Sequence, residues 1–239
     1  MGRAGGANFR SMPPDPHPSP RQLWDISPPV QAGTPVFPGD TPYQQHWSAT
    51  LGPGCPVNVS SLTLSPHVGA HADAPLHYDP QGESAGQLDL TPYLGPCRVI
   101  HAIGCGPLIE WRHIAHACDH VGNPASHALP APLPARVLVR TYAHAPVSHW
   151  DAALAAFAPH TVEQLAARGV LLIGIDTASI DSADSKTLDS HQVIRRLNLR
   201  VLENLVLDDV PEGDYELIAL PLKLMTADAS PVRAVLRSL

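Results

Sequence analysis

The sequence lacks several features that would place it in common functional classes. No apolar stretch approaches the roughly 18–20 residues of a membrane-spanning helix, so we expect no membrane partner. The formal net charge is −7, and no stripe of lysine and arginine suited to a phosphate backbone is visible, which argues against a nucleic-acid partner. The N-terminal stretch MGRAGGANFRSMPPDPHPSP has no apolar core typical of a secretory signal.

Cysteine is also scarce. The four cysteines, Cys55, Cys97, Cys105 and Cys118, follow no Cys-x-x-Cys spacing. This pattern predicts reduced thiols in a cytoplasmic protein rather than a disulfide framework or a zinc knuckle. Proline, in contrast, accounts for 27 of 239 residues, so many connections are expected to be rigid turns.

The chain shows no internal repeat and no second domain boundary. Residues 1–20 are dominated by Gly, Pro and Ser, which predicts a disordered tail, and residues 21–239 are assigned to one domain. Alternating or continuous apolar patterns predict strands at residues 57–64 (with a bulge near 60–61), 98–103, 136–141, 170–175, 201–207, 215–220 and 232–236. Helices are predicted at 108–121, 161–168 and 186–197. Strands alternating with helices indicate a mixed α/β fold.

Ligand-capable side chains are concentrated in HVGAHADAPLHY, residues 67–78. His67, His71, Asp73 and His77 follow directly on the strand pattern VNVSSLTL. Imidazole and carboxylate groups together suit Zn²⁺, Mn²⁺ or Fe²⁺, so the segment predicts a metal site. The alternative is a hydrogen-bonded structural loop. By comparison, His113, His116 and His120 fall on the polar face of the predicted 108–121 helix, which indicates a solvated face.

Two residues far along the chain are harder to interpret. Glu203 interrupts VLENLVL, a strand pattern that is apolar on both faces, and a buried carboxylate needs a cation, a donor or a metal. A salt bridge to an arginine is one explanation. His191, in DSHQVIRRL, lies at the edge of the apolar face of its predicted helix, where a hydrogen-bonded, half-buried histidine would be ordinary.

One motif resembles a catalytic signature without its structural context. GESAG, residues 82–86, matches the Gly-x-Ser-x-Gly elbow that carries the nucleophile of serine hydrolases. That elbow requires a preceding strand and a following helix, whereas the turn-like YDPQ precedes this one. We therefore predict that Ser84 is not a nucleophile.

The helix predicted at 161–168 opens with a possible capping box, Thr161 and Gln164, and ends at Gly169.

Several longer stretches carry a family resemblance that extends from Leu23 to Leu236. They are WDISPPV, FPGDTPY, PVNVSSLTLSPHVGAHADAPLHY, GPCRVIHAIG, GIDTASID, DSKTLDSH, VLENLVLDDVPEGDYELIALPLK and DASPVRAVLR. The chain resembles the metal-dependent cyclase family, and within it the bacterial kynurenine formamidases. The resemblance implies a single domain with the swivelling β/β/α fold, a central mixed sheet with flanking helices, and a homodimer or larger even oligomer.

The resemblance also implies a binuclear site, usually of zinc, with Mn²⁺ or another divalent ion possible. His67, His71 and Asp73 would hold the first ion, and Asp73 would bridge to a second. His191 and Glu203 would complete the second site, which gives both residues a role.

Two more roles follow from the same resemblance. His77 would be the acid/base residue, and Phe37 would contact the substrate where the family usually has tryptophan. The implied reaction is hydrolysis of N-formyl-L-kynurenine to L-kynurenine and formate in tryptophan breakdown. Three rivals remain at this point: an isatin-type cyclic amide hydrolase on the same fold, a serine hydrolase, and a non-catalytic metal-binding module.

Overall fold

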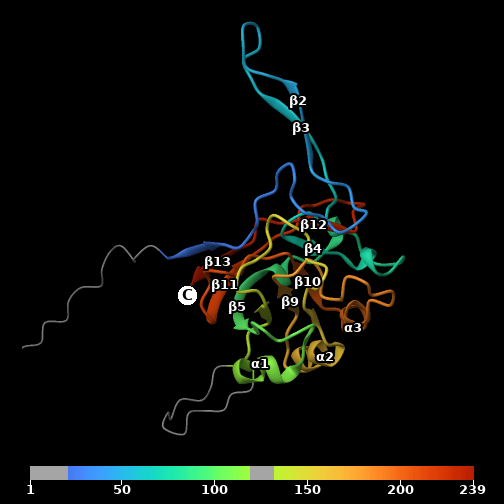
Figure 1. The fold of residues 1–239 in the computed structure, drawn as a ribbon, viewed down its shortest axis with the longest axis vertical. Helices are drawn as coiled ribbons and strands as arrows, with labels where there is room; N and C mark the ends of the chain where they lie inside the picture. Colours follow the sequence, from blue (N-terminus) through green and yellow to red (C-terminus); the bar gives the residue numbers. More distant parts are fainter. Residues whose placement is uncertain (1–20, 119–131) are drawn as a thin grey trace, which may run out of the picture.

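The computed structural model describes residues 21–118 and 132–239, so the predicted tail and His120 lie outside the described residues. A nine-stranded mixed sheet forms its centre, in the order β1-β13-β11-β5-β7-β9-β10-β4-β12 (Figure 1). The strands are β1 (Leu23–Asp25), β4 (His71–Asp73), β5 (Leu94–His101), β7 (Arg136–Arg140), β9 (Leu172–Ile175), β10 (Arg200–Glu203), β11 (Gly213–Ile218), β12 (Ala229–Pro231) and β13 (Val235–Ser238). The central strands β5, β7, β9 and β10 are parallel, and the strands outside them pair antiparallel.

Apolar side chains cover both faces of the central strands. In β7, Val137 and Val139 belong to one buried cluster and Leu138 to the other. In β9, Ile173 shares the cluster of Val137, whereas Leu172 shares that of Leu138. Burial on both faces is what a parallel sheet requires, and it explains why the strand predicted at 170–175 is apolar without alternation.

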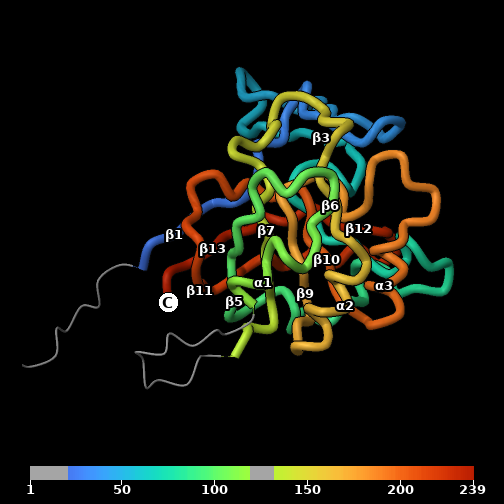
Figure 2. Tube along the Cα trace, turned by 60° about the horizontal axis from the view of Figure 1, so that its bottom comes forward, coloured from blue at the N-terminus to red at the C-terminus, as the bar shows by residue number. Residues whose placement is uncertain are grey.

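Three helices cover one face of the sheet, and they lie together in Figure 1 and again in the turned view of Figure 2. They are α1 (Trp111–Cys118), α2 (Pro159–Ala167) and α3 (Asp189–Leu197). Ile114, Leu165 and Ile194 of these helices are fully buried in the cluster that contains Ile173. The predicted α/β class with a mixed sheet and flanking helices is confirmed.

Some predicted element boundaries were wrong for identifiable reasons. The strand predicted at 201–207 ends at Glu203, because Asn204 has a left-handed backbone with φ of 58°. The capping box predicted at Thr161 is absent: α2 begins at Pro159, a favourable first position, and Thr161 is buried inside the helix. Gly169, with φ of 86°, follows the helix end as predicted.

The segment predicted as a helix from 108 also begins differently. Leu108–Ile109 forms β6, which pairs in parallel with β8 (Ala156–Phe157), and α1 starts only at Trp111. Along α1, Ile114 and Cys118 are buried and His116 is exposed as expected, whereas His113 is half-buried and accepts a hydrogen bond from the backbone N–H of Glu110.

A hairpin of β2 (Gln44–Ala49) and β3 (Val59–Thr63) projects from the body of the molecule (Figure 1). Its irregularity lies in β2, between Trp47 and Ala49, rather than in β3 where the sequence suggested a bulge. Three short 3-10 helices complete the described elements: η1 (Pro75–His77), η2 (Ala85–Gln87) and η3 (Thr91–Tyr93). Among the described residues, no helix is long and apolar enough to cross a membrane.

Candidate metal centre and active site

Sheet register brings two of the predicted ligands together. β10 and β4 are antiparallel neighbours, and Glu203 lies directly opposite His71 in that pairing. The two side chains meet, with His71 Nε2 at 3.3 Å from Glu203 Oε2. A residue from the HVGAHAD segment and a residue more than a hundred positions later therefore form one site.

Asp73 lies at the centre of the cluster and is 1% exposed. One of its oxygens, Oδ1, is 3.1 Å from His67 Nδ1 and 3.4 Å from His71 Nε2. The other oxygen, Oδ2, is 3.2 Å from His191 Nε2. The two carboxylate oxygens thus face different sets of histidines, as a bridging carboxylate would.

Asp181 positions His191, and sequence reasoning did not identify it. Its carboxylate accepts hydrogen bonds from the backbone N–H groups of Ser190 and His191 at the start of α3, where no capping side chain is present. His191 Nδ1 also lies 2.7 Å from Asp181 Oδ2. Since a carboxylate accepts, Nδ1 carries the proton and Nε2 is left facing Asp73. The stretch GIDTASID, in which a turn after a buried strand has an acid at each end, is the sequence signal that could have identified Asp181.

Glu203 is held by the same turn. Its Oε1 accepts a hydrogen bond of 2.7 Å from the backbone N–H of Ile180. Its ion-pair partners within the described part of the chain are His71 and His191 rather than an arginine. The alternative of a salt bridge between Glu203 and an arginine is therefore wrong.

Two atoms in the cluster are buried without a hydrogen-bond partner, and they are His71 Nε2 and Asp73 Oδ1. His71 Nδ1 lies 2.9 Å from the Gly69 carbonyl oxygen and donates to it, which leaves Nε2 as a lone-pair donor toward Asp73. Ligand atoms of His67, His71 and Asp73 all lie within 4.8 Å of one another. Such an imidazole and carboxylate set with unsatisfied inward atoms fits a divalent cation of the zinc or manganese kind.

The electrostatics of the cluster also favour a bound cation. Burial disfavours a charged His71, but the nearby carboxylates of Asp73 and Glu203 outweigh burial and raise the pKa of His71 to about 10. Burial likewise opposes a charged His191, but Asp181 and Asp73 raise the pKa of His191 to about 10. The buried carboxylates thus demand positive charge, which protons or metal ions can supply.

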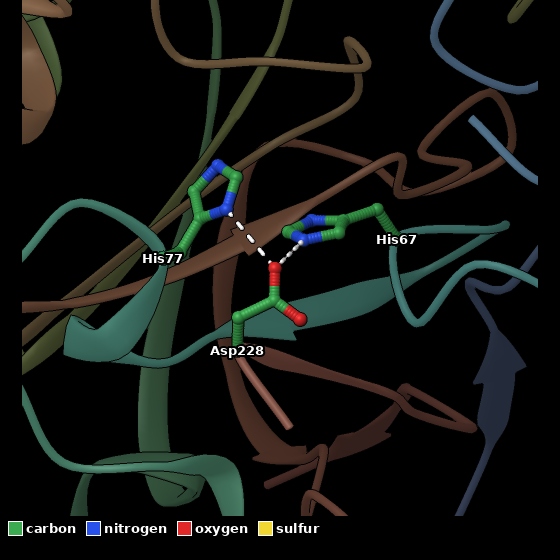
Figure 3. A group of neighbouring side chains, drawn as sticks. All are labelled: His67, His77 and Asp228. Atoms are coloured by element: carbon green, nitrogen blue, oxygen red, sulfur yellow. Dashed lines mark hydrogen bonds and ion pairs between the residues drawn. The ribbon is translucent and has the colours of Figure 1, made fainter. Parts of the chain in front are cut away.

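His77 lies on the open side of the cluster. It ends η1, its side chain is 32% exposed, and its Nδ1 is 3.4 Å from Asp228 Oδ2. His67 Nε2 is 3.1 Å from the same oxygen, and the two imidazole rings have centroids 4.3 Å apart (Figure 3). One nitrogen of His77 also lies within 4.8 Å of ligand atoms of Asp73 and His191. This position is open to substrate and suits either proton transfer or ligation.

Phe37 lies in the loop between β1 and β2. Its ring packs edge-on against Trp150, with centroids 5.0 Å apart. Both rings line a pocket together with Tyr142 and Asn204, and Asn204 directly follows Glu203. Phe37 is 38% exposed, so it does not fill a core gap.

Ser84 has a structural role. It is buried, and its Oγ lies 2.7 Å from the Met225 carbonyl oxygen and 2.9 Å from Gln87 Oε1. Ser84 caps the 3-10 helix η2, with no strand before it. Neither element of a nucleophile elbow is present.

Comparisons with known proteins identify the family of the chain. A family model described as "Putative cyclase" matches residues 24–182. A kynurenine formamidase of Paracidovorax citrulli is 71% identical over 220 residues, covering 92% of this chain and 98% of the relative. A kynurenine formamidase of Delftia acidovorans is 73% identical over 219 residues, covering 92% of this chain and 99% of the relative.

Solved structures show the same fold at lower identity. A predicted metal-dependent hydrolase from Bacillus stearothermophilus has a TM-score of 0.74 and 25% identity, covering 92% of this chain and 100% of its own. An isatin hydrolase bound to the product analogue thioisatinate has a TM-score of 0.75 and 21% identity, covering 91% and 92%. The family and the enzyme class predicted from the sequence are confirmed: the chain belongs to the cyclase family and, within it, to the kynurenine formamidases.

Proposed function

We propose that this chain hydrolyses N-formyl-L-kynurenine to L-kynurenine and formate, as a step of tryptophan breakdown, at a site for two zinc ions. His67, His71 and Asp73 would hold one ion, and Asp73, His191 and Glu203 the other. The observation that carries the proposal is Asp73, whose two oxygens face separate histidine groups in a buried cluster. Relatives above 70% identity that are kynurenine formamidases support the choice of substrate.

The chemistry follows from the groups around the cluster. When bound, divalent ions supply Lewis-acid polarisation of a carbonyl and activate water near neutral pH. Gly69 and Asp181 hold the rings of His71 and His191 so that their Nε2 atoms face inward. His77, on the solvent side, would accept the proton of the attacking water and deliver it to the leaving arylamine nitrogen. The formyl C–N bond breaks, the amine leaves neutral, and formic acid, which keeps the oxygen from water, releases the second proton to solvent to become formate.

Phe37 and Trp150 would contact the aryl ring of the substrate. The two rings meet edge-on, and Phe37 remains exposed enough to offer a face to a ligand. Aromatic pairs of this kind contribute about 0.5–1.5 kcal/mol beyond area burial.

An isatin-type hydrolase is the second candidate, because solved isatin hydrolases share the fold. Both candidates cleave an amide at an aryl nitrogen, so a substrate panel separates them. Purified, zinc-loaded protein should turn over N-formyl-L-kynurenine with kcat/KM at least tenfold above that for isatin. The reverse order would assign the chain to the second candidate, and no turnover of either would leave a metal-binding module.

We also propose that the chain forms a homodimer in the cytoplasm. The projecting β2–β3 hairpin carries exposed apolar side chains, including Trp47, Leu51 and Leu62, which are 51%, 62% and 55% exposed. A second copy of the chain is the occupant that would cover them at all times, as an obligate interface does. The four cysteines are free thiols, which suits a reducing compartment.

Light scattering coupled to size exclusion tests the homodimer and should give a dimer mass. Trp47→Ser combined with Leu62→Ser should weaken the dimer. A monomer at micromolar concentration would contradict the proposal.

A further inference from the structure

Asp228 sits where the sheet fixes its position relative to the metal cluster. It directly precedes β12, in which Ala229 is the register partner of Asp73. Its carbonyl oxygen also accepts a 2.9 Å hydrogen bond from the backbone N–H of Ala74. The backbone of Asp228 is therefore tied on both sides to the strand that carries His71 and Asp73.

A single oxygen of Asp228 faces two imidazoles. Oδ2 is 3.1 Å from His67 Nε2 and 3.4 Å from His77 Nδ1, and Figure 3 shows it lying between the two rings. A carboxylate oxygen accepts and can receive two N–H groups. The arrangement is therefore satisfied when His67 carries its proton on Nε2 and His77 carries its proton on Nδ1.

In each imidazole, the position of the proton determines which nitrogen keeps a free lone pair. With Nε2 protonated, His67 presents the lone pair of Nδ1, the atom 3.1 Å from Asp73 Oδ1, to the cluster. With Nδ1 protonated, His77 keeps the lone pair of Nε2 for taking up a proton. A carboxylate behind a metal-bound histidine orients the ring and raises its basicity, and losing such a carboxylate typically costs 10–100-fold in affinity or activity.

We infer that Asp228 is a positioning residue that sets the tautomers of His67 and His77 together, and so links metal binding to proton transfer. The His77 half rests on the proposed function, whereas the His67 half concerns metal binding alone. The competing explanation is an ordinary surface ion pair, since the Asp228 side chain is 43% exposed. Exposed ion pairs of that kind contribute little to stability and would leave zinc affinity unchanged.

The first test is metal affinity, measured by competition with a chromophoric zinc chelator. Asp228→Asn keeps the shape but removes the charge and one acceptor oxygen, and it should weaken zinc binding about 10–100-fold. Asp79→Asn is the matched control, because Asp79 lies two residues from His77 and pairs with Arg195 instead of a histidine. The control should bind zinc like the wild type. Equal affinities for Asp228→Asn and wild type would overturn the His67 half, whether or not the protein hydrolyses formylkynurenine.

The second test is a double-mutant cycle measured on the zinc-saturated enzyme. Asp228→Asn should lower kcat about tenfold or more, within the 10²–10⁴-fold range that general acid/base catalysis supplies, while KM stays near the wild-type value. In a His77→Ala background the same change should cost no further kcat, because the effect passes through His77. Independent, multiplying losses in the double variant would overturn the His77 half. If the wild type turns over no formylkynurenine, the proposed function fails. The zinc-affinity measurement then still tests the role of Asp228 in orienting His67.

Discussion

Replacement of Glu203 by glutamine tests how the two halves of the cluster depend on each other. Glu203 is 3% exposed and contacts His71 at 3.3 Å and His191 at 3.7 Å. The pKa of His71 rises from 6.5 to about 10, because Asp73 and Glu203 together outweigh the burial of the ring; this net shift corresponds to roughly 5 kcal/mol. Since the burial penalty remains when one carboxylate is lost, Glu203→Gln should lower the free energy of unfolding of the metal-free protein near pH 6 by at least half of that net value, and by up to the roughly 3–5 kcal/mol typical of broken buried pairs.

The assay has two parts. Urea unfolding in the presence of a chelator measures stability, and elemental analysis after zinc loading measures ions per chain. Glu203→Gln should hold about one zinc fewer than wild type and lose at least about a hundredfold in kcat/KM, as expected for an electrostatic group at the reacting centre. Glu83→Gln is the control, since Glu83 is exposed and lies 3.9 Å from Arg200; its stability should stay within about 0.5 kcal/mol of wild type. A Glu203→Gln protein with unchanged zinc content and unchanged stability would refute the assignment of Glu203.

Four further changes have defined outcomes. Since the pKa values of His71 and His191 are raised to about 10 above an ordinary 6.5, their contribution to the stability of the metal-free protein is fully present below about pH 6.5 and is lost as pH rises through 10; denaturation at several pH values should show this decline, and a rise in stability over that range would contradict it. His77→Ala should keep its zinc but lose roughly 10²–10⁴-fold in kcat, and a collapse of zinc content would make His77 a ligand instead. Phe37→Leu should raise KM for formylkynurenine about twofold to tenfold, while Phe37→Trp preserves or improves kcat/KM; unchanged kinetics for Leu would remove Phe37 from the substrate pocket. Ser84→Ala should keep near-normal turnover and lose about 1 kcal/mol of stability from its hydrogen bond to Met225, whereas a thousandfold loss in turnover would revive the serine hydrolase.

The parts of the site that the sequence predicted are those with a local or compositional signal. His67, His71 and Asp73 are crowded into one segment, so their shared chemistry is visible without a structure. Glu203 stood out because a charge interrupts an apolar strand, and the structure shows that charge buried against two histidines. The role of His191 rested on the family resemblance, because an isolated histidine at a helix edge carries no distinctive pattern.

The parts that were missed depend on contacts between distant segments. Asp181 and Asp228 are ordinary acids in turns, and only the fold shows that each carboxylate lies beside a histidine of the cluster. The start of α2 was misplaced because Thr161 matches a capping pattern, while packing buries it and Pro159 begins the helix. Strand pairing sets these positions, and pairing partners are not encoded in any short window of sequence.

The central claim is that activity requires two metal ions held jointly by residues from both halves of the chain. The most direct measurement is a zinc titration of the chelator-treated protein, with formylkynurenine turnover and bound zinc followed in the same samples. Activity should be absent at the start and should reach its maximum at about two zinc ions per chain. Full turnover by protein with no bound metal would contradict the claim.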